Sequence, residues 1–318
     1  GEFSFELYEG TNKLQTVTNK SGKVTFDAIS YTAEGEHTYT VKEVKGDNAT
    51  IAYDASEKQV TVKVTRDGDA LQAEVVYPES KIFTNAFTPN ATTATIELTK
   101  ELTGRDLKDG EFSFELYEGA NKLQTVTNKN GKVTFAPIEY TEEGEHTYTV
   151  KEVAGNTPGI TYDKTDKQVT VKVKKDGDNL KADVAYPDNK TFSNTYTAPQ
   201  PAKAKISASK ILEGAELKNG EFNFQLLDET GKVLQTKQNA ADGTVTFDAI
   251  AYTEAMIGTH KYTIKEVLPA DQANIQYDEG QVDVTVTVTK DEASNAIQAV
   301  VSYGAKKTFI NKVKIARA

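Results

Sequence analysis

The sequence predicts an all-β protein built from three tandem β-sandwich domains. Three observations support this prediction. Apolar residues alternate with polar ones along short segments rich in Val, Thr, Tyr and Phe, as expected for half-buried strands. Turn signals such as Lys20-Ser21-Gly22 and Arg66-Asp67-Gly68-Asp69 separate those segments. The tract GEFSFELYEG begins at Gly1 and again at Gly110, and a diverged version, GEFNFQLLDE, begins at Gly220.

The repeats define the expected domains. Residues 1–26 and 110–135 are identical at 24 of 26 positions, and YTVKEV or YTIKEV follows each GEF tract. A unit of about 110 residues suits an autonomous domain. We therefore expect domains at 1–89, 90–199 and 200–318, which we call the first, second and third repeats. The two seams contain proline, which favours semi-rigid, end-to-end stacking.

Within each repeat, the strands follow in a fixed order. In the first repeat, KVTFDAI, HTYTVKEV, KQVTVKVTRDG and LQAEVVY each show a period of two, and no segment keeps a helical period. Short strands at this spacing, separated by turns, are typical of a sandwich.

Composition excludes several function classes. The 318 residues carry a net charge of −10, which argues against partners such as nucleic acid or anionic membranes. Cysteine is absent and only three histidines occur, so we expect no thiol chemistry, no metal site and no cofactor. No apolar run is long enough to span a membrane, and no signal peptide or anchor is visible, so we expect no membrane insertion in what reads as a mature or excised fragment.

Three strands of the second and third repeats, and two strands of the first, place a polar residue on the face that should point into the core. Side chains alternate across a strand, so Tyr148, Val150 and Glu152 share one face. By the same parity, an asparagine lies among aromatic residues near the end of each repeat, and a lysine lies among aliphatic ones ahead of two GEF tracts. These residues are Glu43, Glu152 and Glu266; Asn85, Asn194 and Asn311; and Lys100 and Lys210.

Two interpretations of this polar set remain open on the residues alone. One is a satisfied polar cluster, in which a Lys–Glu ion pair and an Asn hydrogen bond offset the cost of burial. The other is chemistry. A desolvated lysine becomes a nucleophile, a desolvated glutamate stays protonated and can polarise a carbonyl and move protons, and the asparagine supplies an amide carbon. Attack would release ammonia and leave a Lys–Asn isopeptide bond.

The pattern TKELTG…GEFSFELYEG…YTVKEV…FSNTY resembles the isopeptide-linkage domains of Gram-positive pilins and surface adhesins, of the CnaB type. The resemblance covers essentially the whole chain as three copies. It implies immunoglobulin-like sandwiches of reversed strand topology. It also implies a bond between the lysine of the first strand and the asparagine of the last, promoted by the glutamate. The residues that match are Lys100, Glu152 and Asn194 in the second repeat and Lys210, Glu266 and Asn311 in the third.

The first repeat departs from this pattern. Glu43 and Asn85 are present, but residues 92–109 have no counterpart before Gly1, so their lysine is missing. Either the fragment was cut there or another chain supplies the strand. We expect this repeat to be uncrosslinked and the least stable of the three.

The sequence thus favours a structural stalk of a Gram-positive, cell-wall-anchored surface adhesin or pilin, with neighbouring repeats as its partners. The chain is not expected to be an enzyme beyond a single-turnover crosslinking step. The alternative is an adhesin module that binds a host extracellular ligand. Such a site would be expected in the third repeat, since Glu266 and Asn311 lie further apart than Glu152 and Asn194.

Overall fold

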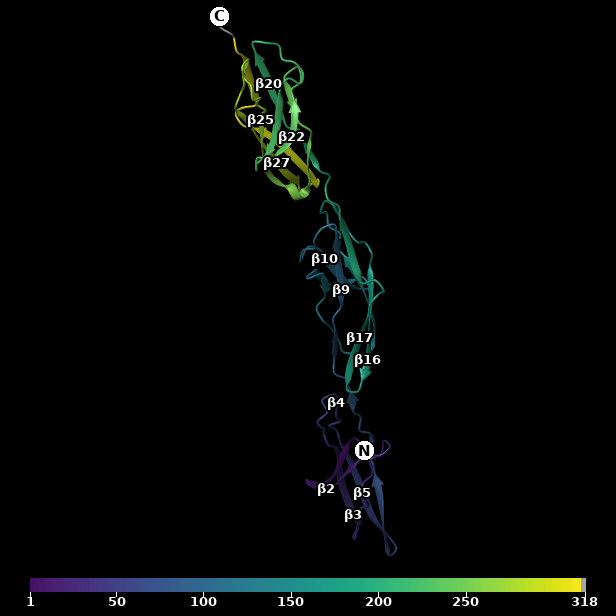
Figure 1. Ribbon diagram of the computed structural model, residues 1–318. Helices are drawn as coiled ribbons and strands as arrows, with labels where there is room; N and C mark the ends of the chain where they lie inside the picture. Colours follow the sequence, from purple (N-terminus) through teal and green to yellow (C-terminus); the bar gives the residue numbers. More distant parts are fainter. Residues whose placement is uncertain (316–318) are drawn as a thin grey trace.

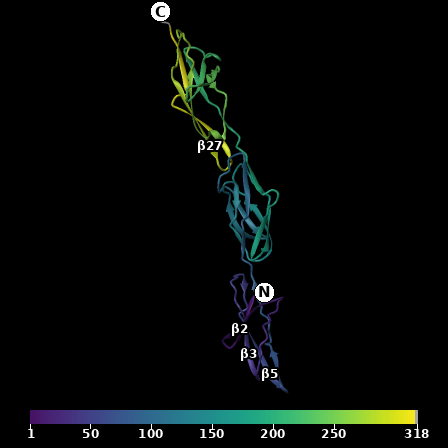
Figure 2. The same cartoon turned by 60° about the horizontal axis from the view of Figure 1, so that its bottom comes forward.

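The computed structural model describes residues 1–315, so the last three residues of the third predicted domain lie outside the described part. Those 315 residues form β-strands and loops with one 3₁₀ turn, η1 (Glu254–Met256), and no α-helix. The all-β prediction is confirmed. Three β-rich units follow one another along an extended line, in both views of the molecule (Figure 1, Figure 2). No helix in residues 1–315 could cross a membrane. We keep 1–89, 90–199 and 200–318 as proposed domain limits.

The second repeat is a two-sheet sandwich. One sheet has the strand order β11-β10-β14-β16-β17, and the facing one has the order β12-β9-β18-β15, with a small β13–β8 pair beside them. Its strands are β8 (Thr92–Ala94), β9 (Glu97–Thr103), β10 (Ser113–Glu118), β11 (Asn121–Thr127), β12 (Lys132–Thr134), β13 (Ile138–Tyr140), β14 (Gly144–Glu152), β15 (Ile160–Thr161), β16 (Lys167–Asp176), β17 (Asn179–Ala185) and β18 (Thr191–Tyr196).

Alternation explains why these segments fold this way. In β14, Tyr148 and Val150 are fully buried while the residues between and beside them reach the surface. The β16–β17 hairpin turns at Gly177, whose φ of 62° suits glycine in such a tight turn.

The third repeat has the same two sheets, ordered β22-β21-β25-β27-β28 and β23-β20-β29-β26, with a β19–β24 pair. Its strands are β19 (Ala202–Ala204), β20 (Ser207–Glu213), β21 (Asn223–Asp228), β22 (Val233–Gln238), β23 (Thr244–Thr246), β24 (Ile250–Tyr252), β25 (Gly258–Glu266), β26 (Ile275–Gln276), β27 (Gln281–Asp291), β28 (Ala296–Tyr303) and β29 (Thr308–Val313).

The first repeat keeps one complete sheet, ordered β2-β1-β3-β5-β6, and a remnant pair β4–β7. Its strands are β1 (Ser4–Glu9), β2 (Asn12–Thr18), β3 (Gly35–Glu43), β4 (Ile51–Ala52), β5 (Glu57–Asp67), β6 (Ala70–Val76) and β7 (Ala86–Phe87). In the second repeat, β9 lies between β12 and β18 and supplies backbone partners to both. Without such a strand, the matching segments 23–25 and 82–85 carry no strand at all.

Each seam is closed by an aromatic ring from the end of one repeat and a lysine from the next. The Nζ of Lys175 lies 3.8 Å from the centre of the Phe87 ring. At the second seam, the Tyr196 hydroxyl donates to Glu254 at 2.7 Å and accepts from Lys290 at 3.1 Å. Glu254 belongs to η1, so this extra turn of the third repeat is part of the seam.

Candidate functional site

In the second repeat, the three inward-facing polar residues meet in the core. Lys100 lies on β9, Asn194 on the neighbouring β18, and Glu152 at the end of β14 in the facing sheet. Lys100 Nζ donates to Oε2 of Glu152 at 2.8 Å, and Asn194 Nδ2 donates to Oε1 at 2.5 Å. Lys100 and Asn194 are each 1% exposed, and the Glu152 side chain is 0% exposed. One carboxylate therefore holds the amine and the amide side by side, away from water.

The third repeat builds the same arrangement from a diverged sequence. Lys210 Nζ contacts both carboxylate oxygens of Glu266, at 3.0 and 2.8 Å, and Asn311 Nδ2 donates to Oε1 at 2.7 Å. All three residues are buried. The parity argument thus brings together the residues it singled out in both complete repeats.

The strand register explains why lysine and asparagine meet. Strands β9 and β18 are parallel neighbours, with Leu102 opposite Asn194, so Lys100 lies two positions earlier on the same face. The long lysine side chain spans that offset. The turn after β9 passes so close to β18 that a Cβ at Gly104 would overlap the carbonyl oxygen of Tyr196, which accounts for the glycine that ends TKELTG.

Burial favours the neutral forms of Lys100, Lys210 and Glu266. Desolvation lowers the pKa of Lys100 and of Lys210, although the neighbouring glutamate acts in the opposite direction. Desolvation raises the pKa of Glu266, against the opposing pull of its lysine. The Nζ of Lys100 also lies 4.5 Å from the centre of the Phe112 ring. Transfer of one proton from lysine to glutamate would yield a neutral nucleophile beside a neutral acid.

An aspartate that the sequence analysis did not single out completes the site. The backbone N–H of Asp163 donates to Oδ1 of Asn194 at 2.7 Å, and that of Asp278 donates to Oδ1 of Asn311 at 2.8 Å. The available signal was the dipeptide Tyr-Asp, which recurs at a similar distance before the asparagine of each repeat.

The first repeat holds part of the same constellation. Asn85 Nδ2 donates to Oε1 of Glu43 at 2.6 Å, and the Asp54 backbone N–H donates to Oδ1 of Asn85 at 2.8 Å. No lysine of a first strand approaches them, because that strand is absent from residues 1–91. Glu43 and Asn85 are half-buried here, whereas their counterparts in the third repeat are buried.

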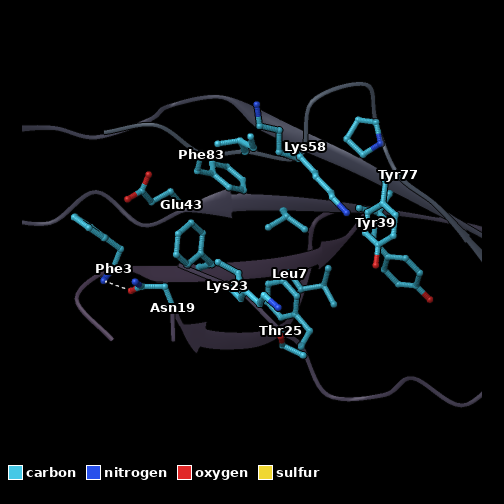
Figure 3. A pocket seen from close by; sticks show the side chains of 18 of the residues that line it. Phe3, Leu7, Asn19, Lys23, Thr25, Tyr39, Glu43, Lys58, Tyr77 and Phe83 are labelled. Carbon is cyan, nitrogen blue, oxygen red and sulfur yellow. Dashed lines mark hydrogen bonds between the residues drawn. The ribbon is translucent and has the colours of Figure 1, made fainter. Parts of the chain in front are cut away.

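A groove of about 1320 Å³ lies where the missing strand would run. Its lining includes Tyr39, Val41, Phe83 and Glu43, and Figure 3 shows Glu43 and the Phe83 ring beside it. Phe83 is half-buried, while its counterpart Phe192, on β18 next to β9, is fully buried. The absence of a strand therefore opens the core of this repeat.

Within residues 1–315, no group of three or more His, Asp or Glu side chains is placed to hold a metal ion.

A family model described as "Spy0128-like isopeptide containing domain" matches residues 1–88, 96–197 and 206–314, which is more than half of the chain. No curated protein matches the chain. Among solved structures, a major pilin (T-13) of Streptococcus pyogenes is similar at 17% identity, over 71% of this chain and 98% of the pilin, with a TM-score of 0.29. The C-terminal fragment of pilus adhesin SpaC from Lactobacillus rhamnosus GG is similar at 14% identity, over 70% of this chain and 100% of the fragment, with a TM-score of 0.29. Family membership rests on the three segments that the family model matches.

Proposed function

The chain belongs to the family of Spy0128-like isopeptide-containing domains, and we propose that it is a load-bearing stalk segment of a bacterial surface structure, locked by self-formed Lys–Asn bonds. The proposed bonds are Lys100–Asn194 and Lys210–Asn311, with Glu152 and Glu266 as their promoters. The observation that carries this proposal is that two repeats of different sequence bury the same amine, carboxylate and amide in mutual contact.

The reaction balances within the site. Lysine transfers a proton to glutamate, and the neutral Nζ attacks Cγ of asparagine. A Nζ–Cγ bond forms, the Cγ–Nδ2 bond breaks, and the glutamic acid protonates the departing nitrogen while its carboxylate takes a proton from Nζ. The products are the isopeptide and ammonia. Each site reacts once, so the chain acts as a structural protein that modifies itself.

The position of the proposed bond suits a mechanical role. It joins β9 to β18, the first and last long strands of the second repeat, and a pull on the two ends of the repeat would act on these strands. A covalent tie there leaves the residues between Lys100 and Asn194 unable to extend. The seam residue Tyr196 follows Asn194 by two positions, so load entering from the third repeat would reach the tie directly.

Single-molecule stretching tests this function. In the wild-type chain, we expect one unfolding event, from the first repeat, and no extension of residues 100–194 or 210–311. Asn194→Ala should add one event of about 300 Å, because about 95 released residues span roughly 3.5 Å each. Three long events in the wild-type chain would contradict the proposal.

The open groove of residues 1–91 favours addition of a lysine-bearing strand to the first repeat. The proposed occupant is a strand with the sequence of residues 93–109. Two observations support this occupant. The first and second repeats are nearly identical in sequence, and the first repeat keeps Glu43 and Asn85 within hydrogen-bonding distance of each other. An exposed sheet edge with unpaired backbone groups readily gains a strand.

We further propose that the chain lies outside the cell, on a Gram-positive surface, as its resemblance to the isopeptide-linkage domains of pilins and surface adhesins implies. Its partners would then be neighbouring repeats. A host ligand remains the alternative partner, with its site in the third repeat, where Glu266 and Asn311 lie further apart than Glu152 and Asn194. The extra turn η1 of that repeat has a seam role instead, because Glu254 contacts Tyr196 and Lys290.

A further inference from the structure

Each repeat directs one backbone N–H at the oxygen of its asparagine amide. The donors are Asp54, Asp163 and Asp278, at 2.8, 2.7 and 2.8 Å. A backbone N–H can only donate, so the atom it contacts must be the amide oxygen. The amide NH₂ therefore faces the glutamate, which contacts it from the opposite side. The glutamate thus meets the nitrogen that would leave, and the aspartate N–H meets the oxygen that would gain charge.

The carboxylate of the same aspartate accepts a hydrogen bond from the strand or segment that carries the asparagine. In the second repeat, Oδ2 of Asp163 accepts from the N–H of Ser193, the residue before Asn194, at 3.0 Å. Its Oδ1 accepts from the N–H of Thr165 at 2.8 Å, within its own loop. The carboxylate therefore fixes the distance between its own N–H and the asparagine.

The first and third repeats form the same hydrogen bond between the aspartate carboxylate and the segment that carries the asparagine. Oδ2 of Asp54 accepts from the N–H of Thr84 at 2.8 Å, and Oδ2 of Asp278 accepts from the N–H of Ile310 at 3.0 Å. Thr84 and Ile310 each precede the asparagine of their repeat.

A lysine accompanies the carboxylate in each repeat, although it comes from different strands or loops. Lys167, on β16, lies near Asp163 and lies 5.3 Å from the centre of the Phe192 ring. In the third repeat, the matching position on β27 is Val282, and Lys306 from the loop before β29 forms the ion pair with Asp278. The cation is thus kept while its sequence position changes.

Hydrogen bonds and the nearby lysine keep the carboxylate of Asp163 ionised. Burial acts to raise the pKa of Asp163, but hydrogen bonds from Thr165 and Ser193 and the charge of Lys167 outweigh it, so the pKa is lowered. An ionised carboxylate accepts hydrogen bonds from the backbone N–H groups of Thr165 and Ser193, and so holds the loop of Asp163 next to β18.

We propose that the backbone N–H of Asp163, and likewise of Asp278, stabilises the oxyanion that forms on the asparagine when lysine attacks, and that the aspartate carboxylate positions it. This inference rests on the proposed crosslinking function. As the Nζ–Cγ bond forms, the carbonyl electron pair moves to Oδ1, where the N–H donates to it. When the pair returns, the Cγ–Nδ2 bond breaks and nitrogen leaves with the proton from glutamate. In this division of work, glutamate moves protons and the aspartate N–H polarises the carbonyl. Loss of one such donor typically slows a reaction about 10²- to 10³-fold.

The test compares rates of bond formation in the full chain. Newly synthesised, pulse-labelled protein is quenched at intervals, and each crosslink is read from the mass of the peptides that contain it. The key variant carries the α-hydroxy acid analogue of aspartate at position 163, which replaces the backbone N–H by an ester oxygen and keeps the carboxylate. We expect the Lys100–Asn194 bond to form about 10²- to 10³-fold more slowly. The Lys210–Asn311 bond in the same molecule should keep its wild-type rate and serves as the control.

A second variant, Asp163→Ala, tests the positioning role. It should slow the Lys100–Asn194 bond roughly tenfold or more through misplacement of the N–H. The rate should fall at every pH, and the pH profile should also move to lower pH, because the charge of Asp163 raises the pKa of Lys100. A wild-type rate in the ester variant would overturn the oxyanion role, and a wild-type maximal rate in Asp163→Ala would overturn the positioning role. Absence of any bond in the wild-type chain would instead refute the proposed function itself.

Discussion

Replacement of Asn194 by alanine should remove the crosslink of the second repeat and leave its Lys100–Glu152 ion pair in place. The bond would close a loop of about 95 residues, which the chain-entropy model values at about 4.7 kcal/mol. For a domain of this size, that corresponds to a decrease of roughly 20–35 °C in the Tm of the second repeat.

Relative to the unreacted site, the substitution also removes two hydrogen bonds, one to Glu152 and one from the N–H of Asp163. Their loss costs about 1–3 kcal/mol in its own right. The first repeat offers a matched control, because Asn85→Ala removes the two corresponding bonds, to Glu43 and from Asp54, where no lysine is available to crosslink. The difference between the two variants isolates the contribution of the crosslink.

Differential scanning calorimetry of the full chain measures both effects, with the transition of each repeat assigned from its own variant. We expect the transition of the second repeat to fall by several times more than that of the first. Equal decreases in the two variants would refute a covalent contribution and would leave only a polar cluster.

Three further predictions follow from the same contacts. Glu152→Ala and Glu266→Ala should each abolish the bond in their own repeat only, which peptide mapping would reveal; a bond that survives in either variant means that the glutamate is not required. A peptide with the sequence 93–109 should form a covalent adduct with the first repeat on a denaturing gel, and an adduct that persists after Asn85→Ala would place the reaction elsewhere. Hydrogen bonds from Ser56 and Thr84 lower the pKa of Asp54 from 3.8 to about 2, so its ionised form stabilises the first repeat above pH 3.8 and this contribution is lost as the pH falls toward 2. Acid titration of Asp54→Asn, followed by circular dichroism, should lack that loss.

Much of the site could be predicted from strand parity. Period-two alternation assigns each residue to a face, so Lys100, Glu152 and Asn194 had to point inward in the company of apolar neighbours. Burial of a charged group needs a partner, so their mutual contact followed from the cost of leaving any of them alone.

The aspartate could not be predicted in this way. Asp163 acts through its backbone N–H, which every residue except proline possesses, and its carboxylate binds backbone groups whose positions only the fold defines. Lys306 escaped prediction for a related reason, since it reaches Asp278 from a loop while the matching cation of the second repeat comes from a strand.

The first repeat shows a second limit of sequence reasoning. Residues 82–87 show the same alternation as β18, and parity predicts that Phe83, Asn85 and Phe87 share one strand face. In the structure, only Ala86 and Phe87 form a strand, β7. The reason is that β18 depends on hydrogen bonds from β9, a partner outside its own segment.

The mass of the intact, purified chain tests the central claim most directly. Each Lys–Asn bond forms with loss of one ammonia, about 17 Da, so two bonds should make the chain lighter than its sequence mass by about 34 Da. Asn194→Ala and Asn311→Ala should each restore about half of that deficit relative to their own sequence masses. A wild-type mass equal to the sequence mass would contradict the account, because the buried lysines and asparagines would then meet without reacting.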